Sequence, residues 1–185
     1  DEDALAFRRD EREFLNVTLA ELPNGDFAFT TLRNFALSSW ALLMWQRLAT
    51  SSDEQLAAIA GKAVKEARYH REHAADWVVR LGDGTDESTR RMACALERLW
   101  PYCAELFDAD ETDREAAAQG LGPTWSTLEE AWRADVAAVL QEAGLALPAD
   151  SAFRSDGKRG RHSEHMGRLL AEMQYLHRAF PGGVW

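Results

Sequence analysis

The stretch from Leu56 to Leu81 decides the fold and reads LAAIAGKAVKEARYHREHAADWVVRL. One stripe of residues recurs along it in alternating steps of four and three: Leu56, Ala60, Ala63, Ala67, His70, Ala74, Trp77 and Leu81. This spacing is typical of a long helix that packs at a shallow angle against nearly antiparallel neighbours. It therefore predicts an up-down helical bundle.

The segments on either side repeat this pattern between clear helix breakers. Ala, Leu, Arg and Glu dominate, and runs of alternating Val, Ile and Thr are missing, so the sequence predicts an all-α protein. The breakers are Pro23-Asn24-Gly25, Ser51-Ser52-Asp53, Gly82-Asp83-Gly84, Gly120 to Pro123, the loop 147–161, and Pro181-Gly182-Gly183. In the last helix we expect Met166, Leu169, Met173, Leu176 and Phe180 to face the core.

The segment from Phe35 to Trp45 is apolar almost all round. A helix with this composition needs neighbours on every side, so the sequence predicts a partner subunit. Aromatic side chains dominate the energetics of interfaces, and we expect Trp40, Trp45 and Trp100 to be the interface residues.

Length and charge limit the function classes. The 185 residues predict one domain, spanning 1–185, and the formal net charge of −10 argues against nucleic acid or an anionic membrane as main partner. No apolar run is long enough to span a membrane. Cys94 and Cys103 form no disulfide or zinc pattern, so we expect two buried thiols and a reducing, cytoplasmic location.

Bundles of this kind build di-iron sites from inward-facing Glu and from Glu-x-x-His pairs. The first helix places Glu11 between Phe7 and Phe14 on its apolar stripe, with Phe14 where the His of the pair belongs. In the segment 56–81, His70 is in place, but Ala67 stands where Glu belongs. The sequence therefore predicts a degenerate site that binds no metal.

A second interpretation of the same residues is that Glu11 and His70 are ordinary buried polar groups with protein partners. Both interpretations predict burial without metal. Glu66 lies at the flank of the stripe, and Lys62, one turn earlier, is the expected salt-bridge partner that replaces the metal's charge.

One dense basic run stands out in this acidic chain, Lys158-Arg159-Gly160-Arg161-His162. Basic clusters with glycine suit phosphate groups, so Lys158, Arg159 and Arg161 are candidate contacts to coenzyme A. The alternatives are a contact with an acidic partner surface and a solvated loop.

Five segments together resemble a known family: residues 9–14 (RDEREF), 65–70 (KEARYH), 104–110 (AELFDAD), 160–167 (GRHSEHMG) and 170–176 (LAEMQYL), with Trp185 at the end. The chain resembles the non-catalytic, ferritin-like C subunit of the bacterial phenylacetyl-CoA epoxidase (ring 1,2-phenylacetyl-CoA monooxygenase). Members of that family have a longer N-terminus with a long bundle helix. The chain opens without Met on Asp1-Glu2-Asp3, so we expect that helix upstream of residue 1.

The resemblance implies a ferritin-like bundle with additional C-terminal helices, and a role without catalysis. The di-iron site lies in a paralogous catalytic subunit, which epoxidises the aromatic ring with dioxygen, using electrons from NADPH. The non-catalytic protein pairs with it in a hetero-oligomer and has no cofactor of its own. The alternative is an independent ferritin-like metalloprotein or oxygenase with an atypical site from Glu11, Glu66 and His70.

Overall fold

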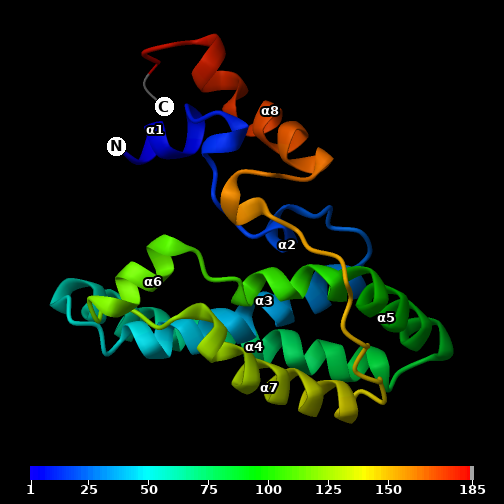
Figure 1. Cartoon of the computed structure of the whole chain (residues 1–185). Helices are drawn as coiled ribbons and strands as arrows, with labels where there is room; N and C mark the ends of the chain where they lie inside the picture. Colours follow the sequence, from blue (N-terminus) through cyan, green and yellow to red (C-terminus); the bar gives the residue numbers. More distant parts are fainter. Residues whose placement is uncertain (184–185) are drawn as a thin grey trace.

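Helices make up the fold of residues 1–183, the part of the chain that the computed structural model describes (Figure 1). The α-helices are α1 (Glu2–Phe7), α2 (Thr18–Glu21), α3 (Phe27–Leu48), α4 (Glu54–Gly82), α5 (Asp86–Leu99), α6 (Glu111–Ala118), α7 (Glu129–Glu142) and α8 (Glu164–Ala179). The 3-10 helices are η1 (Glu11–Glu13), η2 (Trp100–Phe107), η3 (Trp125–Leu128) and η4 (Gly157–Arg159). Within residues 1–183 the only β-type pairing is an isolated bridge, so the predicted all-α, ferritin-like bundle is confirmed. Trp185 lies outside the described residues.

The two longest helices, α3 and α4, form a hairpin at the centre of the bundle (Figure 1). Their first turns are capped by the side chains of Asp26 and Asp53, which accept hydrogen bonds from the backbone N–H groups three residues on. Ala60, Ala67 and Ala74 are buried on α4. Because these side chains are small, the two helix backbones lie close together along much of their length.

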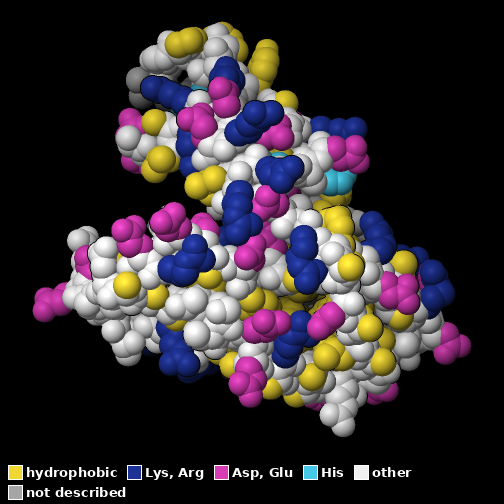
Figure 2. Space-filling model, viewed as in Figure 1, with side chains coloured by type: hydrophobic (Ala, Val, Ile, Leu, Met, Phe, Trp, Pro, Cys, Tyr) yellow, Lys and Arg dark blue, Asp and Glu magenta, His cyan; other side chains and the backbone are white. Residues whose placement is uncertain are grey.

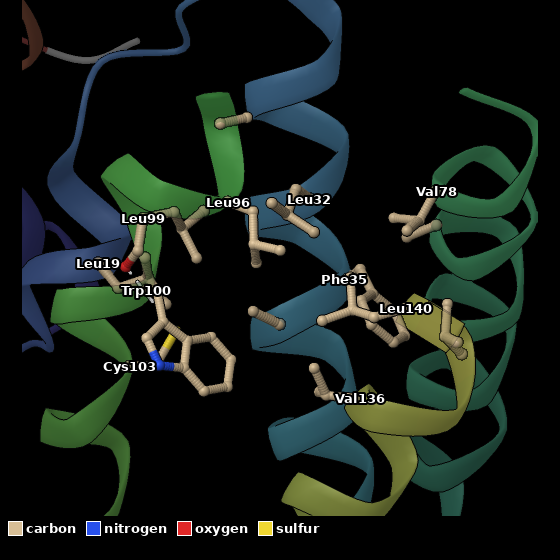
Figure 3. Close-up of a cluster of buried hydrophobic side chains, with 14 of the residues drawn as sticks. Leu19, Leu32, Phe35, Val78, Leu96, Leu99, Trp100, Cys103, Val136 and Leu140 are labelled. Atoms are coloured by element: carbon tan, nitrogen blue, oxygen red, sulfur yellow. Dashed lines mark hydrogen bonds between the residues drawn. The ribbon is translucent and has the colours of Figure 1, made fainter. Parts of the chain in front are cut away.

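Helices α5 and α7 complete the core around α3. Phe35 of α3 lies between Val78 of α4 and Leu140 of α7, while Leu96 and Leu99 close the other side of α3 (Figure 3). Helix α3 thus finds neighbours on several sides within its own chain. Its second half keeps Leu42 and Trp45 only half-buried.

Trp132 of α7 is the largest fully buried side chain among residues 1–183. Its ring packs against Trp100 at a centroid distance of 5.7 Å and against Phe107 at 5.2 Å. Its Nε1–H donates a 3.0 Å hydrogen bond to the carbonyl oxygen of Ala36, which ties α7 to α3. Trp100, predicted at an interface, is instead a core residue of this chain with 6% of its surface exposed.

The helical segment predicted between the breakers Gly82-Asp83-Gly84 and Gly120 to Pro123 changes form at Pro101. Proline has no backbone N–H and disfavours α geometry before it, so α5 ends at Leu99 and the chain continues as η2. Cys103 is buried as predicted, and burial raises the pKa of its thiol to about 12. Cys94 lies on the outer side of α5 and is exposed, so the prediction of two buried thiols was wrong for Cys94.

Residues 1–16 and 161–183 form a separate projection that we call the arm (Figure 1). In the arm, α8 packs against α1 and η1, and it also contacts α2, which follows the arm in the chain. The side-chain amide of Gln174 donates to the carbonyl oxygen of Arg9, and the rings of Phe7 and His177 stack at 4.2 Å. Figure 2 shows the arm standing off the bundle, with acidic and basic side chains interspersed on the visible face.

Two predictions in the arm were wrong. The single helix expected up to Pro23 is divided into α1, η1 and α2, because side chains from elsewhere bind its backbone carbonyl groups. In α8, Leu169, Met173, Leu176 and Phe180 are exposed, and Met166, Leu170 and Gln174 form the buried face. The buried face of α8 therefore runs through Leu170 and Gln174, and the predicted face through Leu169 and Met173 is turned toward solvent.

No helix among the described residues combines the length and the apolar character that a membrane crossing requires.

Candidate functional site

The position predicted to point inward from the first helix does not do so. Glu11 belongs to η1 in the arm and is exposed. Phe14, which takes the place of the missing His, is half-buried, and the Arg9 guanidinium lies 4.2 Å from the centre of its ring. The expected burial of Glu11 was therefore wrong, because the chain leaves helical geometry between Phe7 and Glu11 and this segment belongs to the arm, not to the bundle.

The second half of the predicted site lies on α4, in the bundle. Ala67 is buried, but the side chain of His70 is 59% exposed and pairs at 3.6 Å with Glu66, which is also exposed. His70 lies at the margin of the buried face of α4. Trp77, two turns further along the same margin, is half-buried, and its ring contacts that of Phe27.

The predicted salt bridge from Lys62 is not formed among the described residues, and Lys62 is exposed. The cluster expected to replace a metal charge is thus reduced to the exposed Glu66–His70 pair. Glu11 in the arm and this pair on α4 belong to different parts of the molecule.

A di-iron centre needs several carboxylate and imidazole ligands around one point. Across residues 1–183, no group of three or more His, Cys, Asp or Glu side chains is placed to hold a metal ion. The residues present in this part of the chain do not fit a di-iron centre.

The basic run around Lys158 fastens a loop to the bundle. Lys158 is buried, and its ammonium group lies 2.7 Å from Asp113, donates to the carbonyl oxygen of Asp108, and sits 3.3 Å above the ring of Trp125. A buried ammonium with these partners is not available to a phosphate or a partner protein. This burial and these partners argue against the predicted role of Lys158 as a binding residue.

The two arginines that follow are more accessible. Arg159 is half-exposed and pairs with Asp108 and Asp156. The side chain of Arg161 is 81% exposed, and its one ion pair among the described residues is a longer contact of 3.5 Å with Asp156. The two carboxylates beside Arg159 raise the pKa of its guanidinium. Their negative charges also weaken the attraction between this guanidinium and an anion from solution. Of the three predicted contacts, Arg161 is the one with its charge most open to solvent.

Next to this loop lies a cleft of about 710 Å³ between η2, α7 and residues 150–161. Its floor is aromatic, with Trp100, Phe107 and Trp132, and its rim carries both signs of charge. Arg133 bridges Glu129 at 2.8 Å and Asp150 at 2.9 Å on that rim. Arg133 and Arg159 on this rim are therefore largely neutralised within the chain, which disfavours a polyphosphate ligand at these two positions.

A buried carboxylate, Glu105 of η2, organises the place where the arm meets the bundle. Its oxygens accept hydrogen bonds from the backbone N–H of Thr18 at 2.9 Å, the backbone N–H of Lys158 at 2.9 Å and the hydroxyl of Ser155 at 2.6 Å. With three donors, the carboxylate is satisfied at 3% exposure. Glu105 thereby joins the two chain segments that connect the arm.

A buried pair of titratable side chains, Glu21 and His162, lies near Glu105. Glu21 of α2 and His162 have side chains 2% and 0% exposed, and Glu21 Oε2 lies 3.2 Å from His162 Nδ1. The other oxygen of Glu21 accepts from the backbone N–H of Ser163 at 2.9 Å, and His162 Nε2 lies 2.9 Å from the carbonyl oxygen of Phe14. Burial raises the pKa of the Glu21 carboxyl.

Sequence reasoning missed Glu21, Glu105 and His162. Glu105 stands in the apolar run from Cys103 to Phe107, and a carboxylate in such a run is a usable signal for a buried, hydrogen-bonded acid. Glu21 and His162 are 141 positions apart, and nothing in their local sequence indicates that they meet.

Trp40 and Trp45, the remaining interface candidates, differ in their surroundings. Trp40 packs inward, with its ring 4.7 Å from that of Trp125. Trp45 is half-buried on the side of α3 that also exposes part of Leu42. Trp45 is the better candidate of the two.

The fold and the dispersed ligand positions describe an all-α helical-bundle protein whose described residues assemble no metal centre. The family model for phenylacetic acid catabolic proteins matches residues 1–185, and the chain belongs to that family. A relative from Escherichia coli (strain K12), the C subunit of 1,2-phenylacetyl-CoA epoxidase, is 50% identical over all 185 residues, which span 75% of its length.

Proposed function

We propose that this chain is a structural, non-catalytic subunit that pairs with and stabilises the di-iron catalytic subunit of a phenylacetyl-CoA ring-epoxidising monooxygenase in aerobic phenylacetate degradation. The similarity over the full chain to the C subunit of an epoxidase supports the assignment to this complex. The observation that carries the non-catalytic role is the separation of Glu11, in the arm, from Glu66 and His70, on α4.

The same separation disfavours the alternative of an independent metalloenzyme. An atypical site would need these three side chains around one ion, within about 2–2.5 Å of it. Instead, Glu11 faces the arm's own surface groove with Gly167 and Arg178. We therefore assign the iron and the oxygen chemistry to the catalytic partner and no cofactor to this chain.

We assign the partner surface to the second half of α3 together with α4. Leu42 and Trp45 are half-buried there, and Ile59 is 52% exposed. A partner that covers these side chains removes their remaining apolar surface from water, which favours association. The arginine Arg161 remains a candidate for contact with an acidic surface.

A titration tests this function. The catalytic subunit, its reductase and NADPH are held constant while this chain is added, and oxidation of phenylacetyl-CoA is measured. We expect turnover to rise from background and to saturate at a fixed ratio of the two subunits. Trp45→Ala should raise the concentration required by about tenfold, the usual effect of losing an aromatic anchor.

The matched control is Gln46→Ala, at the exposed neighbouring position of α3, which should titrate as the unmodified chain does. Full turnover by the isolated catalytic subunit would contradict the proposed function. An unchanged titration with Trp45→Ala would contradict only the assigned surface.

A further inference from the structure

The arm is connected to the bundle at one polar joint. The chain enters the bundle through residues 14–18 and leaves it through residues 159–163, and both segments pass the buried pair Glu21 and His162. The side chains of this pair are almost completely closed to solvent. The arm's position therefore depends on how these two groups are satisfied.

The protonation of His162 follows from its neighbours. Its Nε2 lies 2.9 Å from the carbonyl oxygen of Phe14, which can only accept, so Nε2 carries a hydrogen. Its Nδ1 faces Glu21 Oε2 at 3.2 Å, and neither atom has another hydrogen-bond partner among the described residues. Without a proton between them, two lone pairs would face each other in a buried site.

A single proton between Nδ1 and Oε2 removes this repulsion between lone pairs, and it can do so in two forms. It resides on Nδ1, giving an imidazolium beside a carboxylate, or on Oε2, giving a neutral imidazole beside a carboxylic acid. Both forms place a donor between the two atoms. The charged and titratable groups around the pair come from η2, η1, η4 and the following turn: Glu105, Glu11, Arg12, Arg159 and Arg161.

We propose that Glu21 and His162 share one proton that fastens the arm to the bundle, so that the arm loosens when rising pH removes it. This inference concerns the chain alone and does not rest on the proposed function. Loss of the proton leaves a buried carboxylate opposite an imidazole lone pair, and separation of the two segments lets water reach both.

The sign of the effect agrees with the burial of Glu21. Because burial raises the pKa of this carboxyl in the docked arm, the docked form binds the proton more tightly than a solvated form does. The stabilisation that the proton contributes is present at low pH. It is lost as pH rises through the raised pKa.

The variant Glu21→Gln separates this proposal from a merely structural role. A glutamine amide N–H donates to Nδ1 of neutral His162, and its oxygen still accepts from the Ser163 backbone. The joint then needs no shared proton, and the arm should remain docked at every pH. The exposed Glu13 of η1 provides the matched control, Glu13→Gln, which should keep the pH dependence.

The experiment measures the distance between spin labels on the exposed native Cys94 of α5 and on Glu172→Cys of α8, also exposed. Cys103 is buried and stays unlabelled. From about pH 6 to about pH 9, the single narrow distance should broaden in the otherwise unmodified chain and in Glu13→Gln, and should stay narrow in Glu21→Gln. A distance that stays narrow in all three, or that broadens equally in Glu21→Gln, overturns the proposal.

Should Glu21→Gln fail to fold, magnetic resonance of the unmodified chain decides the matter, from the nitrogen-15 signals of the His162 ring and the carbon-13 signal of the Glu21 carboxyl taken together. Because the shared proton resides on Nδ1 or on Oε2, we expect one of these two signals to change over the same pH range in which the label distance broadens. If neither signal changes while the distance broadens, the shared proton is excluded.

Discussion

Replacing Trp132 with alanine lowers the free energy of unfolding by about 3–5 kcal/mol, the range for large aromatic side chains removed from a core. Trp132 is 1% exposed and contacts both Trp100 and Phe107, so its loss leaves a cavity where α7 meets η2. It also leaves the Ala36 carbonyl without the indole N–H. Thermal unfolding should show a decrease in Tm of roughly 10 °C for a chain of this size.

Two further variants calibrate that result. Trp132→Phe keeps an aromatic ring in the core and should lose clearly less than Trp132→Ala, because the residual cavity is smaller. Tyr175→Ala, at a 65% exposed position on α8, should change the unfolding free energy by no more than about 0.5 kcal/mol. A Trp132→Ala chain as stable as Tyr175→Ala would show that the core is not organised around this residue.

The second large effect is expected for Glu105→Gln, which should lower the free energy of unfolding by about 2–4 kcal/mol. The carboxylate accepts from the backbone N–H groups of Thr18 and Lys158 on its two oxygens. An amide of the same shape has only one oxygen, so its NH2 group must face one of these donors. A buried donor is then left without an acceptor.

The location of this loss distinguishes it from a general weakening. Hydrogen exchange should accelerate first at Thr18 and Lys158, while the α3–α4 hairpin keeps its protection. Glu97→Gln, an exposed carboxyl on α5, is the matched control and should leave both stability and exchange unchanged. Equal acceleration throughout α3 and α4 would contradict a local role for Glu105.

The sequence predicted the bundle helices well because their signals are local. Asp53 precedes α4 and caps it, Gly82 ends it, and the small residues Ala60, Ala67 and Ala74 form its buried stripe. Periodicity and breakers alone specify such a helix. His70 was misplaced because it lies at the margin of that stripe, where the spacing alone does not decide burial.

The arm could not be predicted because its structure depends on distant partners. No proline or glycine interrupts residues 4–22, so local propensity favours one continuous helix. The carbonyl oxygens of Arg9 and Phe14 instead accept from Gln174 and His162. Contacts of this kind, between residues far apart in the sequence, override propensity and leave no trace in the local pattern.

The buried groups of the candidate site were also missed because their partners lie far away in the sequence. Lys158 appeared to be part of a solvent-facing basic run, and only the fold brings Asp113 and Trp125 around it. Its ion pair fixes the loop 155–163 against α6, and the Glu105 hydrogen bonds fix it against η2. The feature that most resembled a binding loop is therefore largely a structural one.

The measurement that tests the central claim most directly is the iron content of this chain. The chain alone, and the complex with the catalytic subunit, are loaded with ferrous iron under anaerobic conditions, freed of unbound metal, and analysed for iron per polypeptide. We predict no stoichiometric iron in the chain alone and, in the complex, iron in proportion to the catalytic subunit only. About two iron atoms bound per molecule of this chain, as in a di-iron carboxylate protein, would contradict the account.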